Sequence, residues 1–314
     1  MIDPLVAATI VYGGILSIMC IGLTVTYQTT KVPNFAFADF AVMGMNASYF
    51  SFAILNLGSP YLTIPFAMLA GGAFAVVMYL LIMKPMIRRG SSVIILMVAT
   101  LAVDILFTGV QADIVNIGTV PFTTAFIHKG LPTLLNAPPL PDFTVLGESG
   151  LLILSPAILI LVTVAMYLLL NRSRFGIAMR ASIENPSLAR IAGINVDRVY
   201  LTSWFIAGCL GGLAGCLYTI GDGMSLGIQS ILILDIFAGS VLGGLTSIYG
   251  AVIGGMLVSF GENYVIGTLA INVSSQLALL QIGGISMIIL VITLMAAPRG
   301  LTSINWRKLV LRGS

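Results

Sequence analysis

Charge is scarce in this 314-residue chain, since only 8% of its residues are charged whereas 58% are hydrophobic. So little polar material cannot cover the surface of a soluble protein. The only cysteines, Cys20, Cys209 and Cys216, stand in apolar runs without Cys-x-x-Cys spacing, which argues against a disulfide framework or a metal site. His128 is the single histidine, so a His-Glu-x-x-His zinc enzyme is excluded.

A phosphate-binding loop is also missing. The sequence contains no Gly-x-x-x-x-Gly-Lys-Ser/Thr motif, and no Gly-Lys dipeptide at all. ATP therefore cannot be bound in the P-loop manner by this chain. We expect a protein that is not an enzyme, with no catalytic residues, metal ligands or cofactor of its own.

What the chain has instead is apolar runs of about 20 residues or more, the length that a helix needs to cross a bilayer. Seven of them cover roughly residues 5–27, 61–83, 91–111, 151–170, 199–220, 231–260 and 277–296. An eighth, 35–55, contains Asp39 and Asn46 and follows Pro33, so we expect a broken helix there. The run 231–260 is long enough to cross twice. The sequence predicts one transmembrane domain over 1–314, all-α and polytopic, with eight or nine helices and one or two broken or re-entrant segments.

The basic residues predict the orientation, because cytoplasmic loops carry an excess of Lys and Arg. With the N-terminus outside, all but Lys129 fall on the cytoplasmic side: Lys31, Lys84, Arg88, Arg89, the arginines of 172–198, and Arg299, Arg307, Lys308 and Arg312. Lys129 lies in the loop 112–149, which we expect to be extracytoplasmic. The C-terminus is then cytoplasmic, which requires an odd number of crossings. The protein is predicted in the plasma or inner membrane.

The stretch 171–198 holds five arginines between two apolar runs. Anchoring by the positive-inside rule alone would explain them. However, Asn185 is a good N-cap, Pro186 suits the first helical position and Gly193 suits the residue after the helix end. A capped helix over 186–192 is more than anchoring needs. It indicates a rigid cytoplasmic element that docks on a partner.

Three blocks of sequence resemble one family. The loop pattern G-x-A-x-R-A followed by A-x-x-x-G-I is carried by Gly176, Ala178, Arg180, Ala181, Ala189, Gly193 and Ile194. The other two blocks are GLTVTYQTTKVPNFAFADFAVMGM and the glycine-rich DIFAGSVLGGLTSIYGAVIGG. Together they are similar to the inner-membrane permeases of ABC transporters that import branched-chain amino acids, urea or short amides.

This resemblance implies an importer subunit for branched-chain or other small amino acids. Its partners would be a second permease chain, identical or paralogous, two cytoplasmic ATPase subunits that carry ATP and Mg²⁺, and an extracytoplasmic solute-binding protein. The loop 171–198 would be the coupling loop to the ATPases, with its contacts expected at Gly176, Arg180, Glu184, Arg190 and Gly193. A permease for urea or short amides is the alternative within the family.

Four intramembrane acids mark a candidate route, because a charge at mid-bilayer is costly and tends to face the bundle interior. They are Asp39, Asp104, Asp235 and Glu262. Asp39 follows Asn34, a possible helix cap, at a place where the family pattern begins a pathway-lining helix, and broken helices often build transporter sites. We predict that the route is lined by Asn34, Phe35, Phe37, Asp39 and Asp235.

Two alternatives stay open for these acids. Asp39 could serve only to hydrogen-bond a neighbouring helix. In a gradient-driven transporter, Asp39, Asp104 or Glu262 would carry protons or sodium, although the capped loop would then be unexplained. Phe37, at a place where the family commonly has a polar residue, favours a hydrophobic amino acid over urea. The Gly-x-x-x-Gly pairs, such as Gly208 with Gly212, predict close helix packing within the chain.

Overall fold

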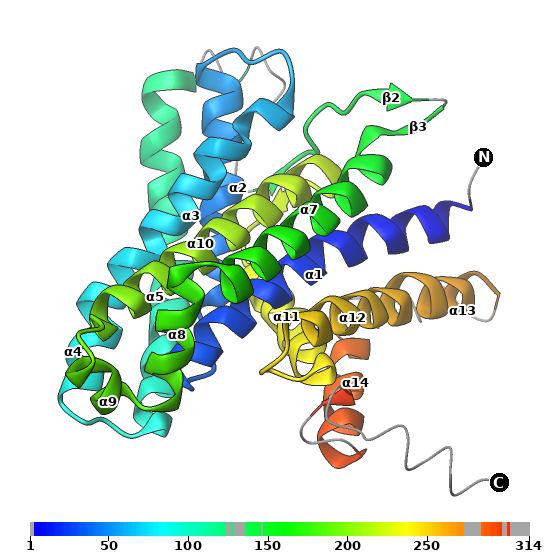
Figure 1. The fold of residues 1–314 in the computed structure, drawn as a ribbon. Coiled ribbons are helices and arrows are strands. Elements are labelled where there is room, and N and C mark those ends of the chain that lie inside the picture. Colours follow the sequence, from blue (N-terminus) through cyan, green and yellow to red (C-terminus); the bar gives the residue numbers. More distant parts are fainter. Residues whose placement is uncertain are drawn as a thin grey trace, which may run out of the picture.

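The apolar runs fold into helices that pass back and forth between two ends of the molecule (Figure 1). The computed structural model describes residues 3–123, 127, 136–145, 147–272, 284–296, 300 and 301. Six helical stretches are long and apolar enough to cross a membrane: Pro4–Thr30, Pro60–Arg88, Val93–Phe122, Gly150–Arg172, Val196–Gly221 and Ile248–Ile271. The prediction of an all-α, multi-pass membrane protein is confirmed.

The first, fourth and fifth of these stretches are single helices: α1 (Pro4–Thr30), α7 (Gly150–Arg172) and α10 (Val196–Gly221). The second joins η1 (Pro60–Thr63), α3 (Ile64–Met78), η2 (Tyr79–Met83) and α4 (Lys84–Arg88), and the third joins α5 (Val93–Thr119) and η3 (Val120–Phe122). The sixth begins with α12 (Ile248–Ser259) and continues through η4 (Phe260–Ile266) into α13 (Gly267–Asn272). Both η2 and η4 are π-helical, an irregularity found often at functional sites.

Three shorter apolar helices complete the bundle: α2 (Phe37–Ile54), α11 (Gln229–Gly243) and α14 (Gly284–Ala296). The run 231–260 is thus two antiparallel helices, α11 and α12, joined by a turn at Gly244, which has φ of 99°. The described residues thus hold six long apolar stretches and these three shorter helices, and the number of membrane crossings stays a prediction. The orientation expected from the charge pattern also stays a prediction, and Arg299, Arg307, Lys308 and Arg312 lie outside the described residues.

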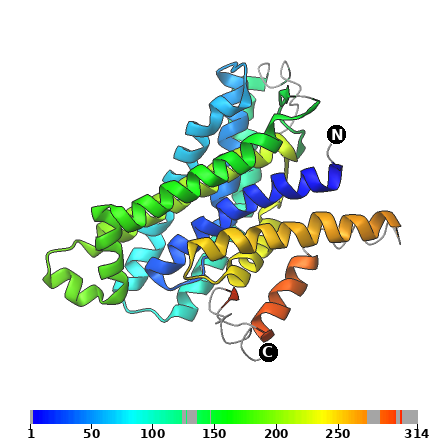
Figure 2. The same cartoon turned by 45° about the vertical axis from the view of Figure 1, so that its right-hand side comes forward.

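We call one end of the molecule the basic end. It holds Lys31 after α1, the helix α4, and the loop helices α8 (Arg174–Glu184) and α9 (Pro186–Ile191), and the figures show this gathering (Figures 1 and 2). The turn between α11 and α12 also lies there, because the Gln28 amide donates to the Thr246 carbonyl at 2.9 Å. The opposite end holds the start of α1 and the short hairpin of β2 (Thr144–Val145) and β3 (Glu148–Ser149).

One more strand pair fastens the opposite end. β1 (Asn136–Ala137) pairs antiparallel with β4 (Met224–Ser225), the segment between α10 and α11. It ties part of the expected loop 112–149 to the bundle. That loop is shorter than expected, because α5 continues to Thr119. His128, Lys129 and Pro132 lie outside the described residues.

The expectation of a broken helix at 35–55 was wrong. α2 is continuous, and the irregular part is the segment 32–36 before it. Phe37, the first residue of α2, packs against Gly22, which lies nine residues before Lys31 and so about 13 Å along α1. The segment therefore runs back inward, and α2 begins inside the bundle rather than at the basic end.

Helix α10 lies at the centre of the bundle and packs most extensively on α3 and α2. Small residues make this possible: a Cβ added to Gly212 would lie 2.1 Å from the Ala67 carbonyl oxygen, and one added to Gly215 would lie 2.1 Å from that of Ala41. The same holds for Gly254 of α12 against Gly239 of α11. These glycines pack helices within the chain, as predicted.

Candidate functional site

The loop 171–198 is more structured than expected, because it contains two helices. Ser173 caps α8 by accepting from the Gly176 N–H at 3.1 Å, and the Arg180 guanidinium donates to the Leu170 carbonyl at 2.5 Å. A Cβ on Gly176 would lie 2.0 Å from the same carbonyl, so α8 folds tightly back on the end of α7. The sequence analysis missed α8, although Ser173 before an amphipathic run was a usable N-cap signal.

The expected helix at 186–192 is present as α9, one residue shorter. The Asn185 side chain accepts from the N–H groups of Ser187 and Leu188, both at 3.1 Å, and Gly193 ends the helix with φ of 84°. Leu188 and Ile191 stand one turn apart and are 62% and 83% exposed. α9 thus presents two apolar side chains outward from a rigid, capped turn.

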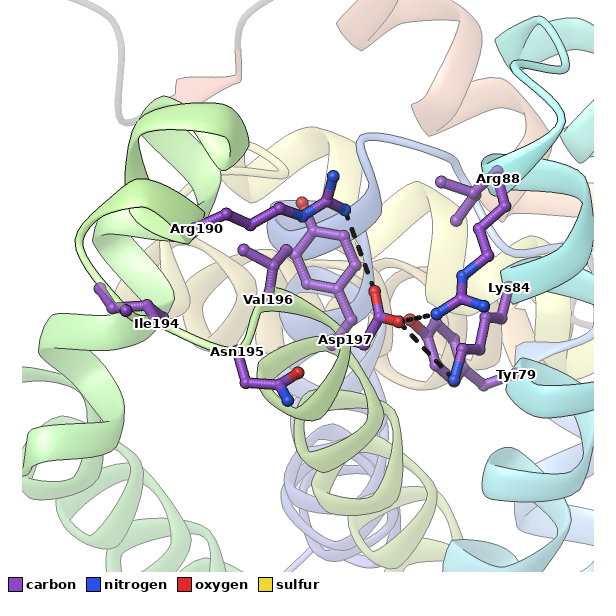
Figure 3. Close-up of a pocket in the computed structure, with 11 residues that line it drawn as sticks. Tyr79, Lys84, Arg88, Arg190, Ile194, Asn195, Val196 and Asp197 are labelled. Carbon is purple, nitrogen blue, oxygen red and sulfur yellow. Dashed lines mark hydrogen bonds and ion pairs between the residues drawn. The ribbon is translucent and has the colours of Figure 1, made fainter.

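A carboxylate that the sequence analysis missed holds α9 against the bundle. Asp197, in the first turn of α10, pairs with Lys84 at 3.7 Å, with Arg190 at 3.9 Å and with Arg88 (Figure 3). Lys84 and Arg88 belong to α4, and Arg190 belongs to α9. One acid in the first turn of a helix that follows a basic loop was the signal that could have found it.

The predicted coupling residues all lie in this region. Arg180, Glu184, Arg190 and Gly193 are exposed, although Arg180 and Arg190 also make the contacts within the chain described above. A cavity of about 640 Å³ separates α4 from the loop that follows α9, and the Asp197 ion pairs border it (Figure 3). The role of the predicted coupling residues in binding an ATPase stays a prediction.

The second part of the candidate site is a row of polar side chains between α2 and α5, all of them buried except Asp104, which is half-buried. Asp39 is fully buried, and in the described part of the chain neither of its carboxylate oxygens has a hydrogen-bond partner. Asp104 on α5 is the acid that faces it, close enough that a proton on either carboxyl group would join the two by a hydrogen bond. The role of Asp39 as a route residue therefore stays a prediction, beside the alternative that it only hydrogen-bonds a neighbouring helix.

A second pair of polar residues lies seven residues further along α2 and α5. Both begin nearer the basic end and run parallel, and Asn46 and Gln111 each follow the two acids by seven residues, which places them on the same helix faces. Among the described residues, neither side-chain amide has a partner for its nitrogen or its oxygen. Gln229 of α11 joins the row, since its nitrogen donates to Thr108 at 2.6 Å while its oxygen is unpartnered.

We call Asp39, Asn46, Asp104, Gln111 and Gln229 the polar ladder. An unpartnered buried polar group costs about 1–3 kcal/mol. Natural structures keep few such groups, and each one calls for a reason such as a ligand, an ion or water. The polar ladder spans about 10 Å of α2, from seven residues at 1.5 Å each. It can offer hydrogen bonds to a polar solute at successive depths.

The predicted route residues near Asp39 have mixed positions. Asn34 does not cap α2, since Ala36 is the N-cap and the Asn34 side chain accepts from the Ala36 N–H at 3.1 Å. Phe35 stands at the start of the polar ladder, stacked on Phe237 at 4.8 Å between ring centroids. Phe37 is fully buried in the packing of α2 on α1.

The Asp235 side chain does not face the polar ladder; it points from α11 toward α1 and η4. The Tyr12 hydroxyl of α1 donates to it at 2.5 Å, and Glu262 of η4 and Ser286 of α14 lie beside it. Ser286 in turn donates to Glu262. The structure therefore does not bring Asp39 and Asp235 into one group, and the predicted single route divides into two sets of residues.

The comparisons with known proteins assign the chain to a family. A family model described as the permease component of branched-chain amino acid transport systems matches residues 5–298. The chain belongs to this family. It is 38% identical to the probable branched-chain amino acid transport permease protein LivH of Methanocaldococcus jannaschii over 305 residues, 96% of this chain and 92% of that protein.

More distant relatives bear related names. The chain is 26% identical to the high-affinity branched-chain amino acid transport system permease protein BraD of Pseudomonas aeruginosa, covering 80% of this chain and 82% of that protein. It is 24% identical to the corresponding LivH of Salmonella typhimurium, covering 80% and 81%. No solved structure matches the chain. The resemblance found in the sequence is confirmed at the level of the family.

Proposed function

We propose that this chain is the permease subunit of an ATP-driven importer for branched-chain or other small amino acids. The observation that carries the proposal is α9, a capped helix that exposes Leu188 and Ile191 at the basic end. A loop that served only as a positive anchor would need neither the cap nor the apolar pair. Both suit a groove on a second protein.

The partners follow from the family. A second permease chain, identical or paralogous, completes the membrane part, two cytoplasmic ATPase subunits hold ATP and Mg²⁺, and an extracytoplasmic binding protein delivers the solute. In this arrangement the basic end faces the cytoplasm and the opposite end faces outside, in agreement with the charge pattern. The N-terminus is then outside and the C-terminus inside.

The Asp197 ion pairs give the proposed coupling a physical route. A push on α9 moves Arg190, and Asp197 passes the movement to Lys84 and Arg88 of α4 and to α10. α4 continues directly from the π-helical η2, a place where a helix accommodates changes in winding. α10 packs on α2, which carries Asp39. Movement of α9 would thereby open or close access to the polar ladder in alternation.

The polar ladder is the proposed transport route through the chain. Its amides and carboxylates can replace water around the polar groups of an amino acid, and Phe35 and Phe237 offer an apolar surface at one end of it. The names of the relatives support branched-chain amino acids as the solutes. Urea and short amides remain the alternative within the family.

Uptake into vesicles tests the proposal. The purified complex is placed in liposomes with loaded binding protein and labelled leucine outside and ATP inside, with a non-hydrolysable ATP analogue as the control. We expect uptake that requires hydrolysis and survives collapse of the ion gradients. Uptake that follows a proton or sodium gradient without ATP would identify a secondary transporter instead. Uptake of urea but not leucine would change the substrate and keep the mechanism.

A further inference from the structure

A second cavity lies on the other side of the bundle from the polar ladder. It has a volume of about 520 Å³ and is bordered by α1, α7, α10, α11 and η4. Its mouth is at the opposite end, where Ser149 before α7 and Asp222 after α10 line it. Asp235 lies at its base, six residues or about 9 Å into α11.

Two carboxyl groups lie at the base of this cavity. Asp235 is 1% exposed and accepts from Tyr12 through one oxygen, while its other oxygen, Oδ1, has no hydrogen-bond partner among the described residues. Glu262 lies beside it and accepts from Ser286. Glu148 and Asp222 add two acids to the lining, and no lysine or arginine is among the described residues that form it.

The walls of the cavity are apolar. Val11 of α1, Leu152 of α7 and Ile228 before α11 line it together with further aliphatic side chains. An inorganic cation would gain nothing from such walls, whereas an alkyl chain attached to a cationic group would be removed from water there. Carboxylates at the base and aliphatic walls together fit an alkylammonium group.

We propose that this cavity binds the ammonium group of an amine-bearing solute at Asp235 and Glu262, with the attached aliphatic chain against the walls. In a leucine-like amino acid the carboxylate is attached to the same carbon as the ammonium group, so it would lie close to the two acids and weaken binding relative to the plain amine. The assignment of the transported amino acid as the natural ligand rests on the proposed function. The recognition of ammonium by this pair of acids does not.

Three related small molecules separate the parts of this recognition. Leucine carries the ammonium group, the branched chain and a carboxylate, 3-methylbutylamine lacks the carboxylate, and 4-methylpentanoate lacks the ammonium group. The assay is the thermal unfolding temperature of the purified complex without ATP or binding protein. We expect saturable stabilisation by 3-methylbutylamine, weaker stabilisation by leucine because its carboxylate lies near the two acids, and none by 4-methylpentanoate.

Substitutions locate the effect. Asp235→Asn and Glu262→Gln keep the size of the side chain and should weaken amine binding roughly tenfold or more, because a charge-assisted hydrogen bond is lost. Asp113→Asn, which removes an exposed acid of α5, is the matched control and should bind normally. If either carboxylate variant does not assemble, the comparison of the three ligands on the unmodified complex still decides.

Some outcomes would overturn the proposal. They are stabilisation by 4-methylpentanoate as strong as that by the amine, stabilisation by sodium chloride with none by the amine, or amine binding unchanged in both carboxylate variants. The uptake assay stands apart from these. Failure of ATP-driven uptake with amine binding intact would reject the proposed function alone, and loss of amine binding with normal uptake would reject only this site.

Discussion

The carboxylates on the two sides of α11 differ in how many hydrogen-bond partners they have. On one face, Asp39 of the neighbouring α2 is buried with both oxygens unpartnered and only Asp104 before it. On the other face, Asp235 and Glu262 receive hydroxyl groups from α1 and α14. Asp235 keeps one unpartnered oxygen, Oδ1, whereas Asp39 has two, so the Asp39 carboxylate is the one that contributes least to folding.

This difference separates two kinds of polar group inside one bundle. The groups around Asp235 join helices that are distant in the sequence, as α1 and α11 show. The polar ladder joins few helices, because α5 has little contact with α2 and most side chains of α5 are exposed. In the proposed function, the transported solute makes the hydrogen bonds that the chain leaves unmade in the polar ladder.

The largest expected effect is at Asp39. Asp39→Leu should raise the stability of the folded chain by about 1–3 kcal/mol, because it removes an unpartnered buried polar group. The same change should lower leucine uptake at least tenfold, as polar contacts to the solute are lost. Thermal unfolding and ATP-driven uptake measure the two quantities. Reduced stability together with reduced uptake would show that Asp39 is structural and would remove the contrast.

Tyr12 should behave in the opposite way. Tyr12→Phe keeps the ring but removes the hydroxyl that Asp235 accepts, so we expect a loss of about 1–2 kcal/mol in the free energy of unfolding. Tyr249→Phe, at an exposed tyrosine of the basic end, is the control and should change little. An unfolding temperature for Tyr12→Phe equal to that of the unmodified chain would mean that this bond contributes nothing.

Gln111 gives a smaller version of the Asp39 test. Gln111→Leu has similar volume and removes two unpartnered amide atoms, so we expect a gain of about 1 kcal/mol in stability. Uptake should fall by a few fold, less than for Asp39, because no charge is removed. The comparison would be weakened if the variant unfolded at a lower temperature than the unmodified chain.

Asp142, in the loop at the opposite end, is a reference carboxylate with several partners, and its expected effect is the smallest. Burial alone would raise its pKa, but hydrogen bonds from Ser149, from the Leu151 N–H and from Tyr61 hold the pKa below the usual range. A lowered folded-state pKa contributes stability above the unfolded-state value of about 3.9, and that stability is lost as the pH falls further.

The measurement for Asp142 is the unfolding temperature between pH 6 and pH 3. The unmodified chain should lose stability below about pH 4 as Asp142 becomes protonated. Asp142→Asn should be less stable at pH 6 and less sensitive to acid. Equal acid sensitivity of the two proteins would show that Asp142 does not contribute in this range.

Much of the fold could be predicted from the sequence, because membrane helices are recognised by their length and apolar composition. The capped α9 was predictable as well, since Asn185, Pro186 and Gly193 act through local backbone geometry. The continuity of α2 was not predictable, because the polar residues Asp39 and Asn46 interrupt an apolar run and so indicated a broken helix. Their burial depends on neighbours, such as α5, that are distant in the sequence.

The candidate site was predictable only in part for the same reason. Asp39 and Asp235 stood out as acids within apolar runs, but nothing local shows that one faces α5 and the other faces Tyr12. Gln111 and Gln229 are ordinary residues until the parallel arrangement of α2 and α5 aligns them. Asp197 acquires its role only when the fold brings α4 and α9 to the same place.

The most direct test of the account is the rate of ATP hydrolysis by the assembled complex in response to loaded binding protein. It compares the unmodified chain with the double variant Leu188→Asp, Ile191→Asp, which changes only two exposed residues of α9. We predict stimulation by the binding protein for the unmodified chain and none for the variant, with the membrane fold intact by thermal unfolding. Equal stimulation of both would contradict the claim that α9 couples this chain to its ATPases.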